Sequence, residues 1–248
     1  MESEQIYEIL EKAYFSENCH EKAAITALPR LLEKSRTFLD LGASLGQYTR
    51  AANACMREGR ITAVEADPVR FSRLRQNCEK WESAGTNKVT VIHAAVAERS
   101  AKEVEFQTTN SNVSGGLDRH SLDHLPPDVA QSLQWETIRI PAVSIDDICK
   151  DSPPDFVKMD IEGGEYLALK GATRTLARKT TVWLIEVHPF KMADGTRVPD
   201  VVRDLMWRSG YGEEAFFGKS LFRKRVPKDH ISYAISRLKR VVKRLVRK

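Results

Sequence analysis

The sequence predicts an α/β fold built on a doubly wound, mostly parallel sheet. Short apolar runs alternate with segments of helical periodicity along most of the chain, which is the pattern of a parallel sheet covered by helices. The run 37–40 opens into a turn with Gly42 and Gly46, and helix-forming sequence follows from Gln47. The runs expected to form central strands end in polar residues, as they do at the ligand-binding edge of such a sheet.

Length and composition are those of one soluble domain. With 248 residues, 42% of them hydrophobic and 29% charged, the chain is long enough to bury a substantial core. No apolar run approaches the roughly 20 residues of a membrane span, and the N-terminus lacks the pattern of a secretory signal. The cysteines are scattered without metal-ligand spacing, so we expect reduced thiols and a cytoplasmic location.

The expected helices and strands alternate in a definite order. The expected helices cover residues 3–15, 20–34, 47–57, 68–81, 164–178 and 198–209. The expected strands cover residues 37–40, 60–64, 88–96, 103–107, 137–143, 155–163 and 181–189, and a closing hairpin covers 211–217 and 220–223. Pro68 fits the first turn of its helix, where the missing N–H has no partner to lose. The run 88–96 is largely apolar, as expected of a strand buried on both faces.

Two stretches fall outside this pattern. Residues 110–134 are polar and broken by prolines, so we expect loops over the ligand end of the sheet that help to choose the substrate. Residues 225–248 contain nine Lys or Arg and one acid, a balance of +8, so the net charge of +5 leaves 5 − 8 = −3 for the rest. We therefore divide the chain into an N-terminal helical segment (1–35), an α/β domain (36–224) and a basic tail (225–248).

The basic tail has the pattern of an amphipathic helix. From Ser232 to Lys248, apolar residues recur at three- and four-residue steps, with Lys and Arg between them and no acid. Such a helix can lie on an anionic membrane surface, where each cation contributes about 1 kcal/mol. This predicts peripheral contact with the inner membrane face through residues 228–248. A helix docked on the domain, or on a second subunit of a homodimer, is one alternative, and nucleic-acid binding is the least favoured.

The turn after the first expected strand predicts the kind of ligand. A dinucleotide site has the pattern G-x-G-x-x-G, whereas this chain has G-x-x-x-G preceded by Asp40 and lacks a P-loop lysine. A carboxylate there repels phosphate and attracts a cation, and Glu65 at the end of the next expected strand is placed to accept hydrogen bonds from two ribose hydroxyls. S-adenosylmethionine has an ammonium, a sulfonium and a ribose but no phosphate, so it fits both features. The alternative interpretation is a tight turn between strand and helix that binds no ligand. The predicted cofactor-binding residues are Asp40, Gly42, Ser44, Gly46, Glu65 and Ala66.

A second group of polar residues follows the later expected strands. Asp160 and Glu162 alternate with an apolar residue, so a strand that extends this far places both on one face, with Lys158 further back. Glu186 and His188 end the next expected strand. One interpretation is general-base catalysis, in which Asp160, Glu162 or His188 takes the proton from a hydroxyl as it is methylated.

Two other interpretations of this group stay open. A divalent metal held by Asp160, Glu186 and His188 would lower the pKa of the hydroxyl and orient it, although the metal-free interpretation is slightly favoured. The group can also be structural, with an ion pair between Lys158 and Asp160 while Glu162 caps the helix that follows.

Several motifs resemble the FkbM family of S-adenosylmethionine-dependent methyltransferases. They are the segments 40–46, 64–68, 144–148, 155–165, 169–172 and 185–189, which together cover about residues 36–190. The first segment is shared by many methyltransferases, whereas the K-x-D-x-E-G-x-E block from Lys158 and the later E-V-H from Glu186 are far more specific. The resemblance implies a Rossmann-like fold of the class I methyltransferase type and O-methylation of a hydroxyl on a sugar, glycolipid or polyketide-type product. The family usually has Asn in place of Ser44, whose hydroxyl can still hydrogen-bond.

Three functional hypotheses follow. The leading one is an S-adenosylmethionine-dependent O-methyltransferase that acts on a sugar, glycan, glycolipid or related hydroxylated small molecule. Methylation of RNA is an alternative prompted by the basic tail, although the body of the chain contains no recognisable RNA-binding module. The third hypothesis is a non-catalytic binding protein, and the acids that converge on one edge of the sheet argue against it because a scaffold does not need them.

Overall fold

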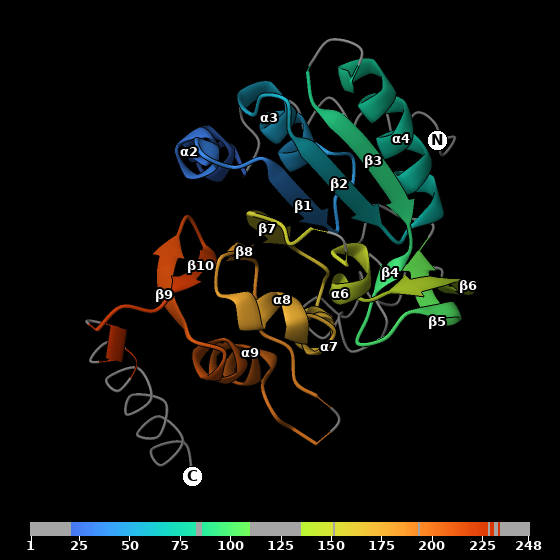
Figure 1. The fold of residues 1–248 in the computed structure, drawn as a ribbon. Helices are drawn as coiled ribbons and strands as arrows, with labels where there is room; N and C mark the ends of the chain where they lie inside the picture. Colours follow the sequence, from blue (N-terminus) through green and yellow to red (C-terminus); the bar gives the residue numbers. More distant parts are fainter. Residues whose placement is uncertain are drawn as a thin grey trace.

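The computed structural model describes residues 21–82, 86–109, 135–150, 152–192, 194–227, 229–230 and 233. The expected helix 3–15, the loop 110–134 and most of the basic tail lie outside these residues. In the described part of the chain, one large sheet and one small sheet contain all the named strands (Figure 1).

The large sheet is mostly parallel. Its strands are β1 (Thr37–Leu41), β2 (Arg60–Glu65), β3 (Lys88–His93), β7 (Phe156–Met159), β8 (Val182–Ile185), β9 (Tyr211–Phe216) and β10 (Lys219–Lys224). They lie in the order β3-β2-β1-β7-β8-β10-β9. The first five strands in this order run parallel, β10 runs antiparallel to β8, and β9 runs antiparallel to β10. The α/β fold class and the closing hairpin are therefore confirmed.

Helices cover both faces of this sheet (Figure 1). One face carries α2 (Lys22–Leu32), α3 (Gln47–Cys55) and α4 (Pro68–Glu82), and the other carries α6 (Ile145–Ile148), α7 (Glu165–Lys170), α8 (Thr173–Arg178) and α9 (Val198–Arg208). Successive strand residues alternate between the two layers, because side chains of a strand point to opposite faces. Phe38 packs in the core under α2 and α3, and its neighbour Leu39 packs in the core under α7 and α9.

The chain order reverses between β1 and β7. From β1 the chain proceeds through β2 to β3 and then returns to β7 on the other side of β1. In open α/β sheets, ligands bind in the crevice at this position, beyond the carboxyl ends of the strands. The turn after β1 touches the end of β7 here, because a Cβ on Gly42 would lie 1.8 Å from the carbonyl oxygen of Asp160. Gly42 also has a φ of +69°, so both the close contact and the backbone conformation require glycine at this position.

A second sheet appears that the sequence pattern does not predict. The expected strand 88–96 divides after β3, and β4 (Ala95–Val96) joins β6 (Trp135–Val143) and β5 (Ala101–Thr109) in the order β4-β6-β5. The break falls at Ala94, whose N–H donates to the carbonyl oxygen of Glu65 at 3.1 Å. Because the run 88–96 is largely apolar on both sides of the break, hydrophobicity alone carries no clear signal for it.

The expected helix 164–178 is also divided, into α7 and α8. Gly171 ends α7, and its backbone packs so closely on the segment after β4 that a Cβ would lie 2.5 Å from the carbonyl oxygen of Ala97. The sequence of residues 164–178 has the pattern of one continuous helix. The close contact at Gly171 instead separates two short helices, α7 and α8.

Asp160 and Glu162 do not share a strand face, contrary to the expectation. β7 ends at Met159 and β8 ends at Ile185, so both strands are shorter than predicted. The N–H of Asp160 still donates to the carbonyl oxygen of Leu41 at 3.0 Å. The backbone then turns sharply, since Glu162 has a φ of +52°. Glu162 therefore lies in a left-handed turn that carries its side chain away from the strand direction.

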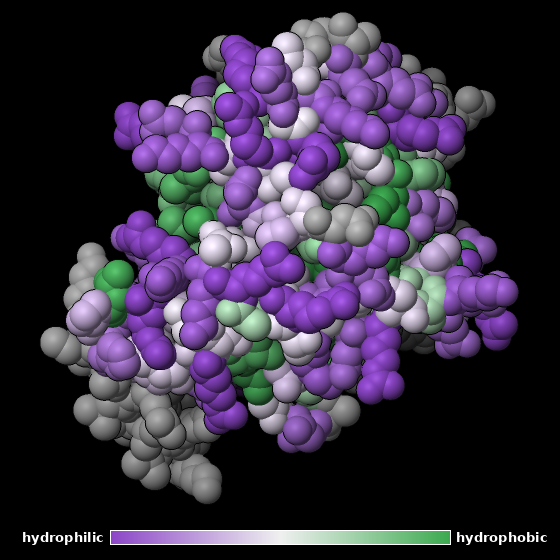
Figure 2. All heavy atoms as spheres, in the orientation of Figure 1, coloured by the Kyte–Doolittle hydropathy of each residue, from purple (hydrophilic) through white to green (hydrophobic). Residues whose placement is uncertain are grey.

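The molecular surface is mostly hydrophilic on the face drawn in Figure 2, where hydrophobic side chains gather only in small areas. The large hydrophobic residues exposed in the described part of the chain are Val69, Leu167, Phe217 and Val226. Among the described residues, no helix combines the length and the apolar character needed to cross a membrane.

Candidate active site

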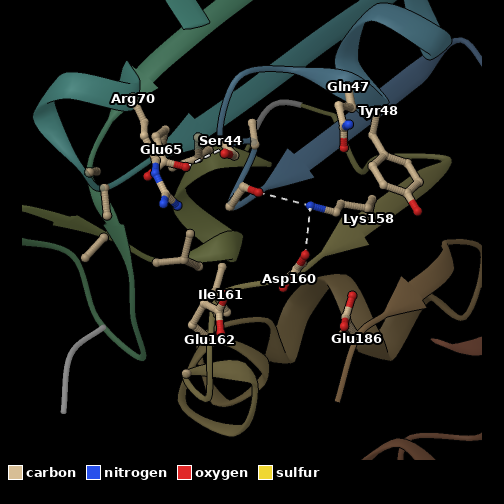
Figure 3. Close-up of a pocket in the computed structure, with 18 of the residues that line it drawn as sticks. Ser44, Gln47, Tyr48, Glu65, Arg70, Lys158, Asp160, Ile161, Glu162 and Glu186 are labelled. Atoms are coloured by element: carbon tan, nitrogen blue, oxygen red, sulfur yellow. Dashed lines mark hydrogen bonds and ion pairs between the residues drawn. The ribbon is translucent and has the colours of Figure 1, made fainter. Parts of the chain in front are cut away.

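A cavity lies over the point where the strand order reverses (Figure 3). Its walls come from the turn after β1, the ends of β2, β7 and β8, the start of α3 and the second sheet. The predicted site residues among its lining are Gly42, Ser44, Glu65, Ala66, Lys158, Asp160, Glu162, Glu186 and His188. Asp40 and Gly46 are not part of the lining. The fold therefore brings the two predicted groups, cofactor-binding and catalytic, into one cavity.

Glu65 is fixed at one end of this cavity by backbone groups. Its Oε2 accepts a hydrogen bond from the N–H of Ser44 at 2.8 Å, and its Oε1 accepts one from the N–H of Asp67 at 2.9 Å. Burial raises the pKa of the Glu65 carboxyl, although Arg70 and the two N–H groups favour the charged form. A carboxylate held in this way has one fixed orientation and keeps further lone pairs for hydroxyl donors.

The wall beside Glu65 is apolar. Small and aromatic side chains from the end of β2, from the segment 94–96 and from β5 line it, namely Ala66, Ala94, Ala95, Val96 and Phe106. A flat aromatic base can lie on such a wall while its attached ribose reaches Glu65. The unexpected second sheet thus supplies part of this wall, since Ala95 and Val96 form β4 and Phe106 belongs to β5.

Lys158 is the buried cation at the centre of the site. Its Nζ donates to the carbonyl oxygen of Gly42 at 3.0 Å and lies 3.5 Å from Asp40 and 3.8 Å from Asp160 (Figure 3). Burial opposes its charge, but the carboxylates of Asp40 and Asp160 outweigh burial and raise the pKa of Lys158 above its usual range. Lys158 is therefore a permanent ammonium group here and not a base. The ion pair with Asp160, one of the structural alternatives, is present.

Asp40 and Gly46 act behind the cavity wall. The Asp40 side chain is fully buried, and its Oδ2 accepts a hydrogen bond from the Thr49 hydroxyl at 2.7 Å while Oδ1 faces Lys158. The acid in the turn thus meets a cation of the protein itself, where the sequence pattern predicts contact with a cationic cofactor. Gly46 is needed for packing, because a Cβ there would lie 2.8 Å from Leu74 and from Trp81.

His188 lies among three acids at the edge of the cavity. Its Nδ1 lies 2.9 Å from Glu165, and its Nε2 lies 3.3 Å from Glu162 and 3.8 Å from Asp160. Burial disfavours the imidazolium, but the hydrogen bond with Glu165 and the charges of the three acids raise the pKa of His188 to about 9. Asp160, Glu162 and His188 have ligand atoms within 4.8 Å of one another and form the candidate metal-binding group of the described residues.

Glu186 does not join that group, although the sequence pattern includes it among the metal ligands. Its carboxylate pairs with Lys219 of β10, which also lies 3.0 Å from Glu21. Glu162 takes the place of Glu186 beside His188, because the left-handed turn after β7 brings it there. The alternative in which Glu162 caps the next helix is not observed: the helix α7 has no side-chain cap, and Glu165 accepts from the N–H of Gly163 instead.

Four residues of the site are missing from the residues predicted from the sequence. Glu165, Tyr48, Glu21 and Lys219 each contact a predicted site residue or line the cavity. Glu165 stands inside the recognised K-x-D-x-E-G-x-E block, so its place in that motif is the one clue available. Glu21 and Lys219 meet only through the tertiary fold, because they lie at opposite ends of the described chain.

The family assignment comes from a model of the methyltransferase FkbM domain, which matches residues 40–212 and therefore most of the chain. The chain belongs to the FkbM family of S-adenosylmethionine-dependent methyltransferases. The matched range contains the glycine turn, Glu65 and the K-x-D-x-E-G-x-E block of this FkbM methyltransferase. Glu21 and Lys219 lie outside it.

Solved structures of other methyltransferases show distant likeness to this FkbM chain. Methyltransferase FkbM from Methylobacillus flagellatus KT is 21% identical with a TM-score of 0.49, covering 76% of this chain and 43% of that one. Precorrin-6y C5,15-methyltransferase from Geobacter metallireducens GS-15 is 19% identical with a TM-score of 0.44, covering 79% and 74%. An O-methyltransferase from Bacillus cereus in complex with SAH is 15% identical with a TM-score of 0.45, covering 89% and 87%. Likeness at this level carries no information about the substrate. Among curated proteins none matches this sequence.

Proposed function

We propose that this FkbM methyltransferase transfers a methyl group from S-adenosylmethionine to a hydroxyl of a sugar, glycan, glycolipid or related small molecule. One observation carries the proposal: a fixed carboxylate, Glu65, stands at one end of the cavity, and a second group of carboxylates around Asp160 stands at the other. The first suits a ribose, and the second suits a hydroxyl that must lose its proton on methylation.

The residues at the Glu65 end fit S-adenosylmethionine. The Glu65 carboxylate, held by the N–H groups of Ser44 and Asp67, is placed to accept hydrogen bonds from vicinal hydroxyls. The apolar wall next to it suits a purine, and Gly42 leaves the turn free of a Cβ. When bound, the cofactor supplies an electrophilic methyl group on a sulfonium. Its net positive charge agrees with the excess of acids along the cavity.

Asp160 is the proposed proton acceptor. Its side chain is 28% exposed and lines the cavity, so it can reach an acceptor hydroxyl. Lys158 beside it is a buried ammonium group whose Nζ lies 3.8 Å from the carboxylate. A hydroxyl becomes a competent nucleophile as its proton passes to such a base. Glu162 and His188 stand next to Asp160 and complete the polar rim that orients the acceptor.

The test is a methyl-transfer screen of sugars, glycans and RNA oligonucleotides, read by mass spectrometry. A mass increase of one methyl group on a hydroxylated sugar acceptor supports the proposal, and transfer to RNA alone would refute it. Asp160→Asn should lower kcat by roughly 10²- to 10⁴-fold while binding of S-adenosylmethionine is kept. Glu105→Gln, at an exposed position on β5, is the matched control and should retain full activity.

A divalent metal is the second candidate chemistry for this site. Asp160, Glu162 and His188 offer two carboxylates and an imidazole within reach of one ion. The hydrogen bond that the His188 ring donates through Nδ1 to the Glu165 carboxylate also resembles the carboxylate–histidine pairs that orient metal ligands. We propose the metal-free route because Lys158 already provides Asp160 with a permanent positive partner. Turnover should therefore persist in EDTA; its loss, with recovery on adding Mg²⁺ or Mn²⁺, would establish the metal route instead.

A further inference from the structure

A buried lysine stands behind the cavity wall opposite Glu65. The Lys219 side chain is 3% exposed, and its Nζ lies 3.0 Å from Glu21 and is paired with Glu186. Glu21 precedes α2, Glu186 follows β8 and Lys219 opens β10, so three distant segments meet at one cation. Glu21 and Glu186 line the cavity, whereas Lys219 borders a separate hollow on the other side.

Tyr48 connects this wall to the centre of the site. Its hydroxyl donates to Glu21, and its ring lies between two cations, with Lys158 Nζ 5.1 Å and Lys219 Nζ 5.9 Å from the ring centroid. Burial, followed by the hydrogen bond to Glu21, raises the pKa of Tyr48 far above its usual range, so the phenol stays protonated and remains a donor. Figure 3 shows Tyr48 and Glu186 on the far side of Lys158 and Asp160 from Glu65 and Arg70.

The position of these groups separates them from the cofactor end. Glu65, which suits the ribose, lies with Ser44 and Arg70 at one side of the cavity, and Glu186 lies beyond Asp160 at the other (Figure 3). Glu186 and Glu21 line the same cavity as Asp160, away from the cofactor end, where there is room for the rest of an acceptor whose hydroxyl gives its proton to Asp160. Those two carboxylates then accept hydrogen bonds from further hydroxyls of the same molecule.

The charge of the wall favours some acceptors over others. The acids along the described lining are Glu21, Glu65, Asp160, Glu162 and Glu186, and the basic residues there are Arg70, Lys158 and His188. Lys219 compensates part of this excess from behind, but it does not line the cavity and cannot bind a ligand there. A carboxylate or phosphate on the acceptor would face Glu21 and Glu186 at short range, where like charges repel strongly.

We propose that Lys219 is a positioning residue that holds Glu21 and Glu186 as the wall of the acceptor subsite, and that this wall selects uncharged polyhydroxylated acceptors over anionic ones. The inference rests on the proposed O-methyl transfer to a hydroxyl and adds the charge class of the acceptor to it. Glu21 and Lys219 lie outside residues 40–212, so the family match does not supply this role.

The acceptor preference is measured with matched sugar pairs in which one member carries an anionic group: methyl glucoside against methyl glucuronide, and maltose against maltose phosphate. We expect kcat/KM to be about tenfold or more higher for the neutral member of each pair. In the double variant Glu21→Gln/Glu186→Gln this ratio should fall towards one. A merely structural role would lower kcat/KM for both members together and leave the ratio unchanged.

The role of Lys219 is measured in the same assay. Lys219→Met should raise the KM for the neutral acceptor by roughly tenfold, with kcat at saturation and the Kd of S-adenosylmethionine unchanged, because the carboxylates lose their anchor. Lys224→Met, on the same strand but exposed, is the control and should change none of these values. If Lys219→Met does not fold, adding Glu21→Gln and Glu186→Gln removes the unpaired acids, and this triple variant should also lose the neutral preference.

Three results would contradict the proposal. Equal or faster turnover of the anionic sugars would refute the selection by charge, and an unchanged acceptor KM in folded Lys219→Met would refute the positioning role. Both results leave the proposed O-methyl transfer standing. Transfer to no sugar of either charge, with binding of S-adenosylmethionine intact, would overturn this inference and the proposed function together.

Discussion

At the scale of single residues, the role of each acid depends on which group of the protein it meets. Glu65 meets two backbone N–H groups and faces the cavity, whereas Asp40 meets Lys158 and Thr49 and is removed from it. Glu186 meets Lys219 and so is withdrawn from His188. Acids that look equivalent in the sequence therefore have different partners in the fold. We propose a cofactor role for Glu65 and proton transfer for Asp160, while the others hold groups of the protein in place.

The first prediction concerns Glu65. In the proposed complex its carboxylate accepts charge-assisted hydrogen bonds from ribose hydroxyls, which are worth on the order of 1.5–3 kcal/mol each. Glu65→Gln, which keeps the shape of the side chain, should therefore weaken binding of S-adenosylmethionine roughly ten- to hundredfold while the fold is kept. Isothermal calorimetry measures the dissociation constant and circular dichroism checks the fold. Glu103→Gln, exposed on β5, is the control, and an unchanged constant in Glu65→Gln would remove Glu65 from the cofactor site.

At the scale of secondary-structure elements, short segments hold one another through caps and close backbone contacts. Asp146 on the four-residue helix α6 caps the start of α8, where its carboxylate accepts from the N–H groups of Arg174 at 2.7 Å and Thr175 at 2.9 Å. Burial opposes the charge of Asp146, but these hydrogen bonds outweigh it and lower the pKa of the carboxyl. The break between α7 and α8 therefore leaves a helix start that a neighbouring element satisfies.

The second prediction concerns this cap and its dependence on pH. Asp146→Asn should reduce the free energy of unfolding by about 1–3 kcal/mol at neutral pH, because the charged acceptor is lost. The folded-state pKa of Asp146 is lowered, so its stabilising effect is present above its ordinary pKa, about 4, and is lost as the pH falls through the folded-state value. Urea denaturation across this range should show the two proteins converging in acid. Parallel pH profiles would contradict the assignment, and Glu33→Gln, at an exposed site, is the control.

The third prediction concerns the contact between β1 and β7. Gly42→Ala places a Cβ against the carbonyl oxygen of Asp160, in addition to the cost of a positive φ. Gly218→Ala is the matched control, since Gly218 has a φ of +83° and nothing lies within 4 Å of the added Cβ. We expect Gly218→Ala to cost about 1–2 kcal/mol and Gly42→Ala clearly more, about 3–5 kcal/mol, with loss of cofactor binding. Equal losses in thermal denaturation would show that φ alone matters at Gly42.

At the scale of the whole molecule, charge is distributed unequally along the chain. The body of the chain is mildly acidic and residues 225–248 are strongly basic. The described part of that segment rests on α9, because the Tyr233 ring stacks on Trp207 at a centroid distance of 4.0 Å and its hydroxyl donates to Asp204. Arg225 also lies over the Trp207 ring at 4.2 Å. The basic segment is thus anchored to the domain near its start, at the beginning of the amphipathic pattern.

The fourth prediction concerns the amphipathic part of the tail. We propose that residues 228–248 bind anionic membrane surfaces, with each basic residue near the surface contributing about 1 kcal/mol. Deleting the part beyond Tyr233, which contains most of these basic residues, keeps Tyr233 on Trp207. This deletion should abolish co-sedimentation with vesicles that contain phosphatidylserine, and leave methyl transfer to a soluble acceptor intact. Vesicles of phosphatidylcholine alone are the control. Equal partitioning of the full-length and shortened proteins would refute the membrane contact.

The local elements of the fold and half of the site could be predicted from the sequence. Strand, glycine turn and helix follow one another within a few residues, so hydrophobic periodicity and the glycines at 42 and 46 suffice to predict them. Glu65 follows from the same unit, because the end of β2 must lie beside the end of β1 in a parallel sheet. These elements could be predicted because the residues that determine them lie close together in the sequence.

Contacts between distant segments were decided only by the tertiary structure. The second sheet needs β4 to leave a largely apolar run, and Glu162 reaches His188 through a left-handed turn. Glu186 pairs with Lys219 and does not join the candidate metal-binding group. Periodicity reports which face of an element is buried, but it does not report which partner a charged side chain will find across the fold. A buried charge takes whichever opposite charge the packing brings within reach, and in this chain that partner was contributed by the last strand of the sheet.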